Sequence, residues 1–300
     1  MKTAKIFLSG TLCISAILLL VISCKKNVNS PVQSPAILLP DSTAPLQTTP
    51  GQTGHLPLPE QYSMNCPGSP FYGDSIIYPS GNFGSPDELI SPVNSPASGS
   101  YYSWPDGLVI NDSTGAINIT RSETGQRYYI GYVKKGTRDT CLNTLIIAGA
   151  AYMDSIYVQN KAVKNMALPY FNANSTVNSP CDQYGQCYWD LSGNANKQKI
   201  QLDEHTGIID LDKTLQNGAF GMTPVNGTTL NAVIYYLLDD HNHALQSMQI
   251  RLMYYDRVSL IPAGLVTKIR NQRTDAIGNQ ILNNPTGTVK PPLIIITRFQ

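Results

Sequence analysis

The chain has 300 residues, a length that by itself indicates about two domains. Charged residues make up 14% of the chain, against roughly 25% in typical soluble proteins, and 21 Lys and Arg nearly balance 20 Asp and Glu. The net charge of +1 argues against a nucleic-acid partner, and the 42% hydrophobic content is too high for a disordered chain and too scattered for several membrane spans.

The first 23 residues have the pattern of an export signal. Lys2 and Lys5 precede an almost uncharged apolar run at 6–22, which is typical of a signal peptide, although a single transmembrane helix is the alternative. Residues 21–24, Val-Ile-Ser-Cys, resemble the lipobox of bacterial lipoproteins. The resemblance implies that Cys24 receives a diacylglycerol and becomes the N-terminus, so that a lipid anchors the protein in the cell envelope, at the outer membrane.

A tether follows the lipidation site at residues 24–60. It is rich in Pro, Ser, Thr and Gln, and prolines recur every five residues between Pro35 and Pro50. Proline at this density favours extended polyproline II and prevents a packed core. The composition predicts a disordered spacer that lifts a folded head off a membrane.

The cysteines of the head are even in number once Cys13 and Cys24 are assigned to the signal and the lipid. The remaining four are Cys66, Cys141, Cys181 and Cys187. An even number in an exported chain favours disulfides, and zinc is the alternative, although the C-x₂-C spacing typical of zinc sites is absent. Cys181 and Cys187 close a short loop that contains Gly185, so we expect this bridge first and the Cys66–Cys141 bridge from the remaining pair.

From about residue 70 onward the pattern predicts strands. Short segments rich in Ile, Val, Tyr and Thr recur between clusters of Gly, Asn, Asp, Ser and Pro, and no long apolar stripe has helical spacing. In the last of these segments Ile250, Leu252 and Tyr254 alternate with Gln249, Arg251 and Met253, so that the first three lie on one face of a strand. The candidate strands are 127–133, 144–147, 155–158, 233–238 and 249–254.

A sequence repeat lies within this region. Residues 110–119 align with residues 202–211 at a constant offset of 92, and Thr114-Gly115 matches Thr206-Gly207. The shared pattern predicts a hairpin, in which an Asn or Asp side chain caps the turn and Gly takes a positive φ. Two copies about one sandwich domain apart indicate two tandem modules.

Residues 105–117 and 125–133 resemble the immunoglobulin-like and cadherin-like repeats of bacterial surface proteins, through Pro-x-Gly-Leu-x-Ile, Thr-Gly-x-Ile and the Tyr-rich strand that follows. The resemblance implies about seven antiparallel strands per module and a role in adhesion or spacing. We therefore expect an all-β fold of tandem immunoglobulin- or cadherin-like antiparallel sandwiches. The expected divisions are a signal peptide at 1–23, a tether at 24–60, module 1 at 61–165, module 2 at 166–265 and a strand-containing segment at 266–300.

Two groups of residues are metal candidates, and both have simpler interpretations. His241 and His243, two apart beside Asp239, would share one face of a strand, but the cluster lies between two strand runs, where a polar turn is expected. Calcium sites of cadherin-like modules use carboxylate oxygens, but the motifs that supply them are absent. We therefore expect no metal and no cofactor. The calcium candidates are Asp203, Glu204, Asp210 and Asp212.

Catalytic motifs are missing from the sequence. It has no Gly-x-Ser-x-Gly elbow, and no two of its few glutamates are recognisable as a glycosidase pair, so we expect no enzyme and no catalytic residues. Trp104 and Trp189 are interpreted as core residues rather than as a sugar-stacking platform. The glutamates, which lie in turn-like surroundings, are Glu60, Glu88, Glu123 and Glu204.

The C-terminal segment is basic and ends in a strand. Residues 292–297 are strand-like, and we expect them to pair with a sheet. The charges form either a weak positive patch or ordinary solvated surface. They are Lys268, Arg270, Arg273, Lys290 and Arg298 against Asp275.

Together these patterns predict a non-catalytic cell-envelope lipoprotein that acts as a binding, adhesion or spacer module, with the membrane and either a glycan or a protein as partners. The alternative is a surface lipoprotein that binds or degrades polysaccharide.

Replacing Cys24 with Ala should release the protein from the membrane fraction, because the lipid would have no attachment site. Fractionation of cells that express either form measures this. A variant that remains in the membrane fraction would show that residues 6–22 are themselves the anchor.

Overall fold

A computed structural model describes residues 62–81, 86–94, 98–104, 107–159, 164–174, 177–181, 186–240, 242–278 and 292–300. The predicted lipidation site Cys24, the predicted tether, Glu60, His241 and Lys290 lie outside these ranges. No helix in the described part is long and apolar enough to cross a membrane.

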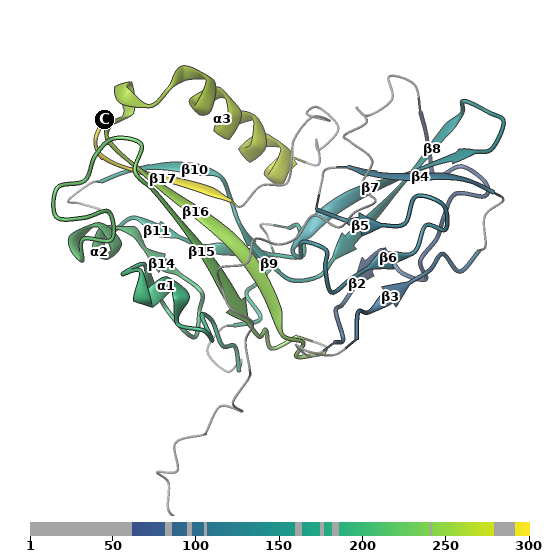
Figure 1. Cartoon of the computed structure of the whole chain (residues 1–300), viewed down its shortest axis with the longest axis horizontal. Coiled ribbons are helices and arrows are strands. Elements are labelled where there is room, and N and C mark those ends of the chain that lie inside the picture. Colours follow the sequence, from purple (N-terminus) through teal and green to yellow (C-terminus); the bar gives the residue numbers. More distant parts are fainter. Residues whose placement is uncertain are drawn as a thin grey trace, which may run out of the picture. The chain divides into compact units, whose positions relative to one another are not determined.

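The first half of the described chain forms two sheets (Figure 1). In the larger sheet β7 pairs antiparallel with β4 and β8, while the short strands β1 and β2 run parallel to β8. Leu108, Tyr128, Leu145 and Ile147 form the core between this sheet and the smaller one. The larger sheet contains β1 (Ser63–Met64), β2 (Ile76–Ile77), β4 (Gly99–Trp104), β7 (Gln126–Lys134) and β8 (Thr140–Ile147), and the smaller contains β3 (Leu89–Ile90), β5 (Val109–Ile110) and β6 (Ile117–Asn118).

The second half has a four-stranded sheet in the order β10-β17-β16-β15. It also has a three-stranded sheet, the pair β9–β12 and three short helical segments. The strands are β9 (Ala150–Tyr152), β10 (Ser155–Val158), β11 (Met166–Ala167), β12 (Pro169–Phe171), β13 (Gln201–Leu202), β14 (Ile209–Asp210), β15 (Thr229–Tyr236), β16 (Gln246–Arg257) and β17 (Leu293–Phe299). The short helical segments are α1 (Asn194–Lys197), α2 (Leu211–Gln216) and η1 (Val258–Leu260).

Strands in several sheets dominate both halves, so the predicted all-β class is confirmed. The predicted return of residues 292–297 to a sheet is also confirmed, because β17 lies between β10 and β16. Both of its pairings are parallel, and they add to the antiparallel pairs that the sequence predicts.

Helix α3 (Ala263–Gly278) departs from the prediction that no long helix follows residue 70. Parallel neighbours such as β16 and β17 need a crossover connection, and α3 lies in that connection. Leu265, Val266 and Ile269 pack in a cluster with residues of β16 and β17 (Figure 1). The remaining side chains are mostly polar and no capping Ser, Thr or Asp precedes the helix, so its sequence has no clear apolar stripe.

The chain passes from the first hydrophobic core to the second within a few residues of Gly149. Ile147 belongs to the first core, whereas Ala150 and Tyr152 belong to the second. Residues 150–158, which the sequence assigns to module 1, pair through β9 and β10 with strands of the second half. The chain therefore joins the second core earlier than the predicted boundary at 165.

The two repeated hairpins share one hydrogen-bonding register. Ile110 pairs with Ile117 in the first, and Leu202 pairs with Ile209 in the second, which preserves the offset seen in the sequence. The cap is also repeated, because Asn111 Oδ1 accepts from the Thr114 N–H and Asp203 Oδ1 from the Thr206 N–H, each at 2.8 Å. Gly115 and Gly207 both have φ +71°, and the hairpins belong to separate sheets.

The repetition extends to distant segments. The carbonyl oxygen of Gly115 accepts a hydrogen bond from the Tyr72 hydroxyl, and that of Gly207 accepts one from Tyr152. An aromatic ring also lies against each glycine, Tyr101 in the first copy and Trp189 in the second. The counterpart of Trp189 at this position is therefore Tyr101 rather than Trp104.

Both predicted disulfides are present. Cys66–Cys141 joins the segment after β1 to the beginning of β8, and Cys181–Cys187 closes the short loop. Cys141, Cys181 and Cys187 are buried, so these bridges form part of the packed head.

Gly115→Ala should lower the free energy of unfolding by more than Gly136→Ala, as measured by urea denaturation. Both glycines have a positive φ, a conformation that costs about 1–2 kcal/mol in a residue that has a β-carbon. A β-carbon at Gly115 would also lie 2.6 Å from the Tyr101 ring, adding about 1–3 kcal/mol of overpacking, whereas Gly136 has no atom within 4 Å. Equal losses in the two variants would contradict this close packing.

Candidate functional site

The Asp239–His243 segment forms the polar turn that connects β15 to β16. Asp240 Oδ1 accepts from the N–H groups of Asn242 and His243 at 3.3 and 3.1 Å. Asp239 Oδ2 accepts from the Gln186 N–H at 3.1 Å, and its Oδ1 lies 3.4 Å from His243 Nε2. Nowhere in the described ranges do three His, Cys, Asp or Glu side chains gather as a metal site would require.

The carboxylates named as calcium candidates have separate structural partners. Asp203 caps the second hairpin, Asp210 caps α2 through the Lys213 N–H, and Asp212 accepts from Asn165. Glu204 accepts from an Asn196 side chain at 3.2 Å. These contacts assign the four carboxylates to turns and caps.

Both tryptophans lie in the core, as predicted. Trp104 packs with Tyr129 and Leu142. Trp189 is 2% exposed and stacks on Tyr236, with ring centroids 5.0 Å apart. Neither ring offers an open face on which a sugar could stack.

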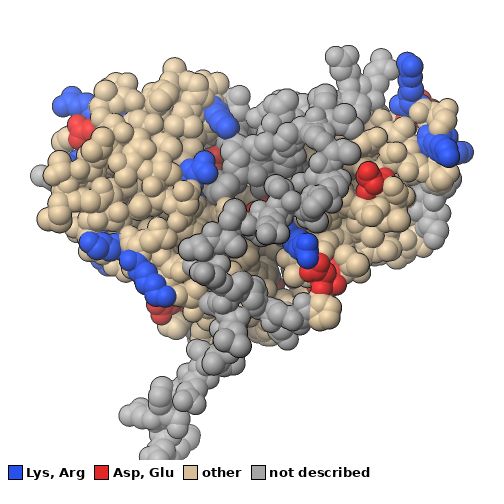
Figure 2. Space-filling model, viewed as in Figure 1, with Lys and Arg blue, Asp and Glu red and all other residues tan. Residues whose placement is uncertain are grey.

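The described basic residues of the C-terminal segment lie on two different elements. Lys268, Arg270 and Arg273 lie on α3, while Arg298 lies near the end of β17 with its guanidinium 5.6 Å from the centroid of the Tyr254 ring. Figure 2 shows the visible Lys and Arg side chains at separate places on this face, several of them beside Asp or Glu. The arrangement fits solvated surface rather than a binding patch.

The buried hydroxyl of Tyr236, at the end of β15, connects three distant segments. It lies 2.6 Å from Thr124 Oγ1, accepts from the Ala150 N–H at 3.2 Å and donates to Gln246 Oε1 at 2.9 Å. Burial raises the pKa of Tyr236 far above its ordinary value, so the hydroxyl stays protonated. The network fixes the place where the chain passes from the first core to the second.

Asn172 lies beside this crossing. Its backbone has φ +52°, a conformation that Asn tolerates better than most residues. Its N–H donates to the Gly149 carbonyl, and its Oδ1 accepts from the Gly149 N–H, both at 2.9 Å. These two bonds fix the amide with its Nδ2 group turned away from Gly149.

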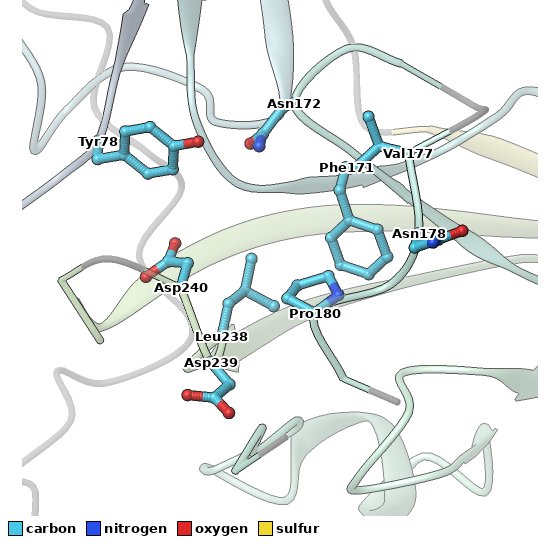
Figure 3. Close-up of a pocket in the computed structure, with 9 residues that line it drawn as sticks. All are labelled: Tyr78, Phe171, Asn172, Val177, Asn178, Pro180, Leu238, Asp239 and Asp240. Atoms are coloured by element: carbon cyan, nitrogen blue, oxygen red, sulfur yellow. The ribbon is translucent and has the colours of Figure 1, made fainter. Parts of the chain in front are cut away.

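A pocket of about 340 Å³ opens next to Asn172 (Figure 3). The Tyr78 hydroxyl, the Asn172 amide and the Asp240 carboxylate lie along one side, and apolar side chains lie opposite. The Asn242 amide ties the turn to the segment after β2, donating to the Tyr78 and Pro79 carbonyls at 3.2 and 3.1 Å. The lining residues are Tyr78, Phe171, Asn172, Val177, Asn178, Pro180, Leu238, Asp239 and Asp240.

Of the residues that line this pocket, the sequence analysis named only Asp239, as part of a metal candidate. Tyr78 and Asn172 carry no motif, since their positions depend on contacts with residues far along the chain. Glu123 lies in the loop before β7, and burial raises its pKa to about 7. Glu123 does not line the pocket.

Comparisons with known proteins do not assign the chain to a family. No family model and no curated protein matches the chain. Among solved structures, human protocadherin-24 EC1-2 overlaps 59% of this chain and 91% of its own, at 8% identity and a TM-score of 0.18. The human desmocollin-1 ectodomain overlaps 60% and 35%, at 12% identity and a TM-score of 0.19. Mouse clustered PcdhgC3 EC1-3 overlaps 62% and 68%, at 12% identity and a TM-score of 0.20. Superpositions this loose carry no argument about the chain.

Tyr236→Phe should lower the free energy of unfolding by about 1–3 kcal/mol, because Thr124, Ala150 and Gln246 each lose a buried partner. Tyr255→Phe, on the neighbouring strand, removes a hydroxyl outside the network and is the matched control. Hydrogen exchange at the Ala150 amide should accelerate only in Tyr236→Phe. An unchanged exchange rate and unchanged stability would contradict the role of this hydroxyl.

Proposed function

We propose that the protein is a non-catalytic, lipid-anchored lipoprotein of the cell envelope whose head binds a ligand at a distance from the outer membrane. The export signal, the lipobox resemblance and the Pro-rich tether support the anchored arrangement. The two disulfides support an oxidising compartment, since disulfides persist in exported proteins.

The observation that carries the binding role is the fixed geometry of the pocket. Asn172 is held by Gly149, and Asp240 is held by two N–H groups of its own turn. Each side chain uses one polar atom for these contacts and retains another for a ligand. Groups fixed before binding lose little entropy when a ligand arrives, which favours recognition.

The duplicated hairpins support a role as adhesion or spacer module as well. Each hairpin is tied to its own core, and the Tyr236 network joins the chain where those cores meet. A head whose two cores are joined in this way is a stiff module, as an adhesion or spacer role requires.

One observation favours the alternative, a polysaccharide-degrading protein. Glu123, with its pKa raised to about 7, has the protonation behaviour of a general acid. A glycosidase also needs a second carboxylate about 5–10 Å across the scissile bond. The acidic residues of the pocket, Asp239 and Asp240, are consecutive in one turn and both hold backbone N–H groups of their surroundings.

Glycan arrays and reducing-end assays with the mature chain separate the two functions. We expect that glycans retained by the protein are recovered intact. Release of reducing ends by the wild type that is lost in Glu123→Gln but kept in Glu88→Gln would overturn the non-catalytic proposal. Glu88 is a suitable control because its carboxylate bonds with Ser80 at the surface.

A further inference from the structure

We infer that the pocket beside Asn172 binds a single neutral sugar ring, through hydroxyl groups that contact Asn172 and Asp240. This inference rests on the proposed binding function and names the ligand class for the same site.

The size of the pocket limits the ligand to a small molecule. Its volume of about 340 Å³ is at the lower end of the roughly 300–1,000 Å³ range of small-molecule sites. A pocket of this size accommodates one ring of a glycan, with the rest of the chain outside. An exposed rim at Val177 and Asn178 leaves room for that continuation.

The polar side chains offer complementary hydrogen bonds to hydroxyl groups. With Asn172 Oδ1 occupied by the Gly149 N–H, the side-chain amide presents Nδ2 as a donor. With Asp240 Oδ1 occupied by its turn, the carboxylate retains Oδ2 as an acceptor. The Tyr78 hydroxyl points toward the Asn172 amide (Figure 3). A hydroxyl-rich ligand satisfies the Asn172 donor and the Asp240 acceptor together.

The opposite wall is apolar. Leu238 and Phe171 are 2% and 3% exposed and form its base, and Pro180 completes it. A sugar ring has the same division, since its C–H groups form an apolar face and its hydroxyls lie at the edge. The pocket therefore matches both sides of one ring.

The charge of the lining excludes some other ligands. Among the described lining residues Asp239 and Asp240 are acidic and none is Lys, Arg or His, so these residues would repel phosphates and carboxylates. A quaternary ammonium group would favour a cage of several aromatic faces, whereas the described lining has only two aromatic residues, Tyr78 and Phe171. A neutral sugar needs neither a positively charged lining nor an aromatic cage.

The test measures binding of neutral monosaccharides and their methyl glycosides to the full mature chain by calorimetry and ligand-observed NMR. Asp240→Asn and Asn172→Asp keep the oxygen that holds the turn or Gly149 and change only the group presented to the ligand. Each should weaken sugar binding by about 10–100-fold, the effect of losing one hydrogen bond to a charged or fixed group. Asp112→Asn makes the same chemical change on an exposed hairpin and should leave binding unchanged. Thermal melts confirm that the variants remain folded.

The outcomes separate this inference from the proposed function. Sugar binding that all three variants retain would place the ligand elsewhere and overturn the inference, while the binding function stands. Binding of calcium or of an organic ammonium ion that is lost in Asp240→Asn, without sugar binding, would assign the pocket to a cation and overturn the sugar. Absence of binding to every probe would overturn the inference too. Sugar cleavage abolished by Glu123→Gln would overturn the proposed function even if the ring occupies this pocket.

Discussion

The buried hydroxyl of Tyr236 is the contact on which the arrangement of this head depends. Through Thr124, Ala150 and Gln246 it joins the loop before β7, the first strand of the second core and the long strand β16. Leaving a buried polar group without a partner is costly, so these segments cannot separate independently. Trp189 stacks on the same ring and lies against Gly207, which links the network to the second hairpin.

The hairpins were predictable because their determinants are local. An Asn or Asp that caps the turn, followed by Thr and by Gly with positive φ, specifies the same turn in both copies. Their tertiary partners were not predictable. Tyr72 and Tyr152 donate to equivalent carbonyls, but they do not keep the 92-residue offset of the hairpins, so no repeat in the sequence reveals them.

The features missed from the sequence depend on contacts between distant residues. The sequence identified β17 as a strand, but its parallel pairing with β10 and β16 follows from a crossover that contains α3. The helix itself contributes only a few apolar side chains, so packing rather than periodicity determines it. The pocket also depends on distant contacts, since the Asn172 amide is held by Gly149, which the sequence around Asn172 does not reveal.

The pocket and the passage of the chain from the first core to the second share one constraint. Gly149 lies where the chain passes from the first core to the second, and a β-carbon there would lie within 3 Å of both Thr124 and Gln246. The backbone groups of that glycine point outward and are satisfied by Asn172. The rigidity that the Tyr236 network imposes on the crossing is thereby transmitted to a side chain of the pocket. A small site gains little contact area, so its affinity must come largely from groups that are already in place, and this crossing supplies them.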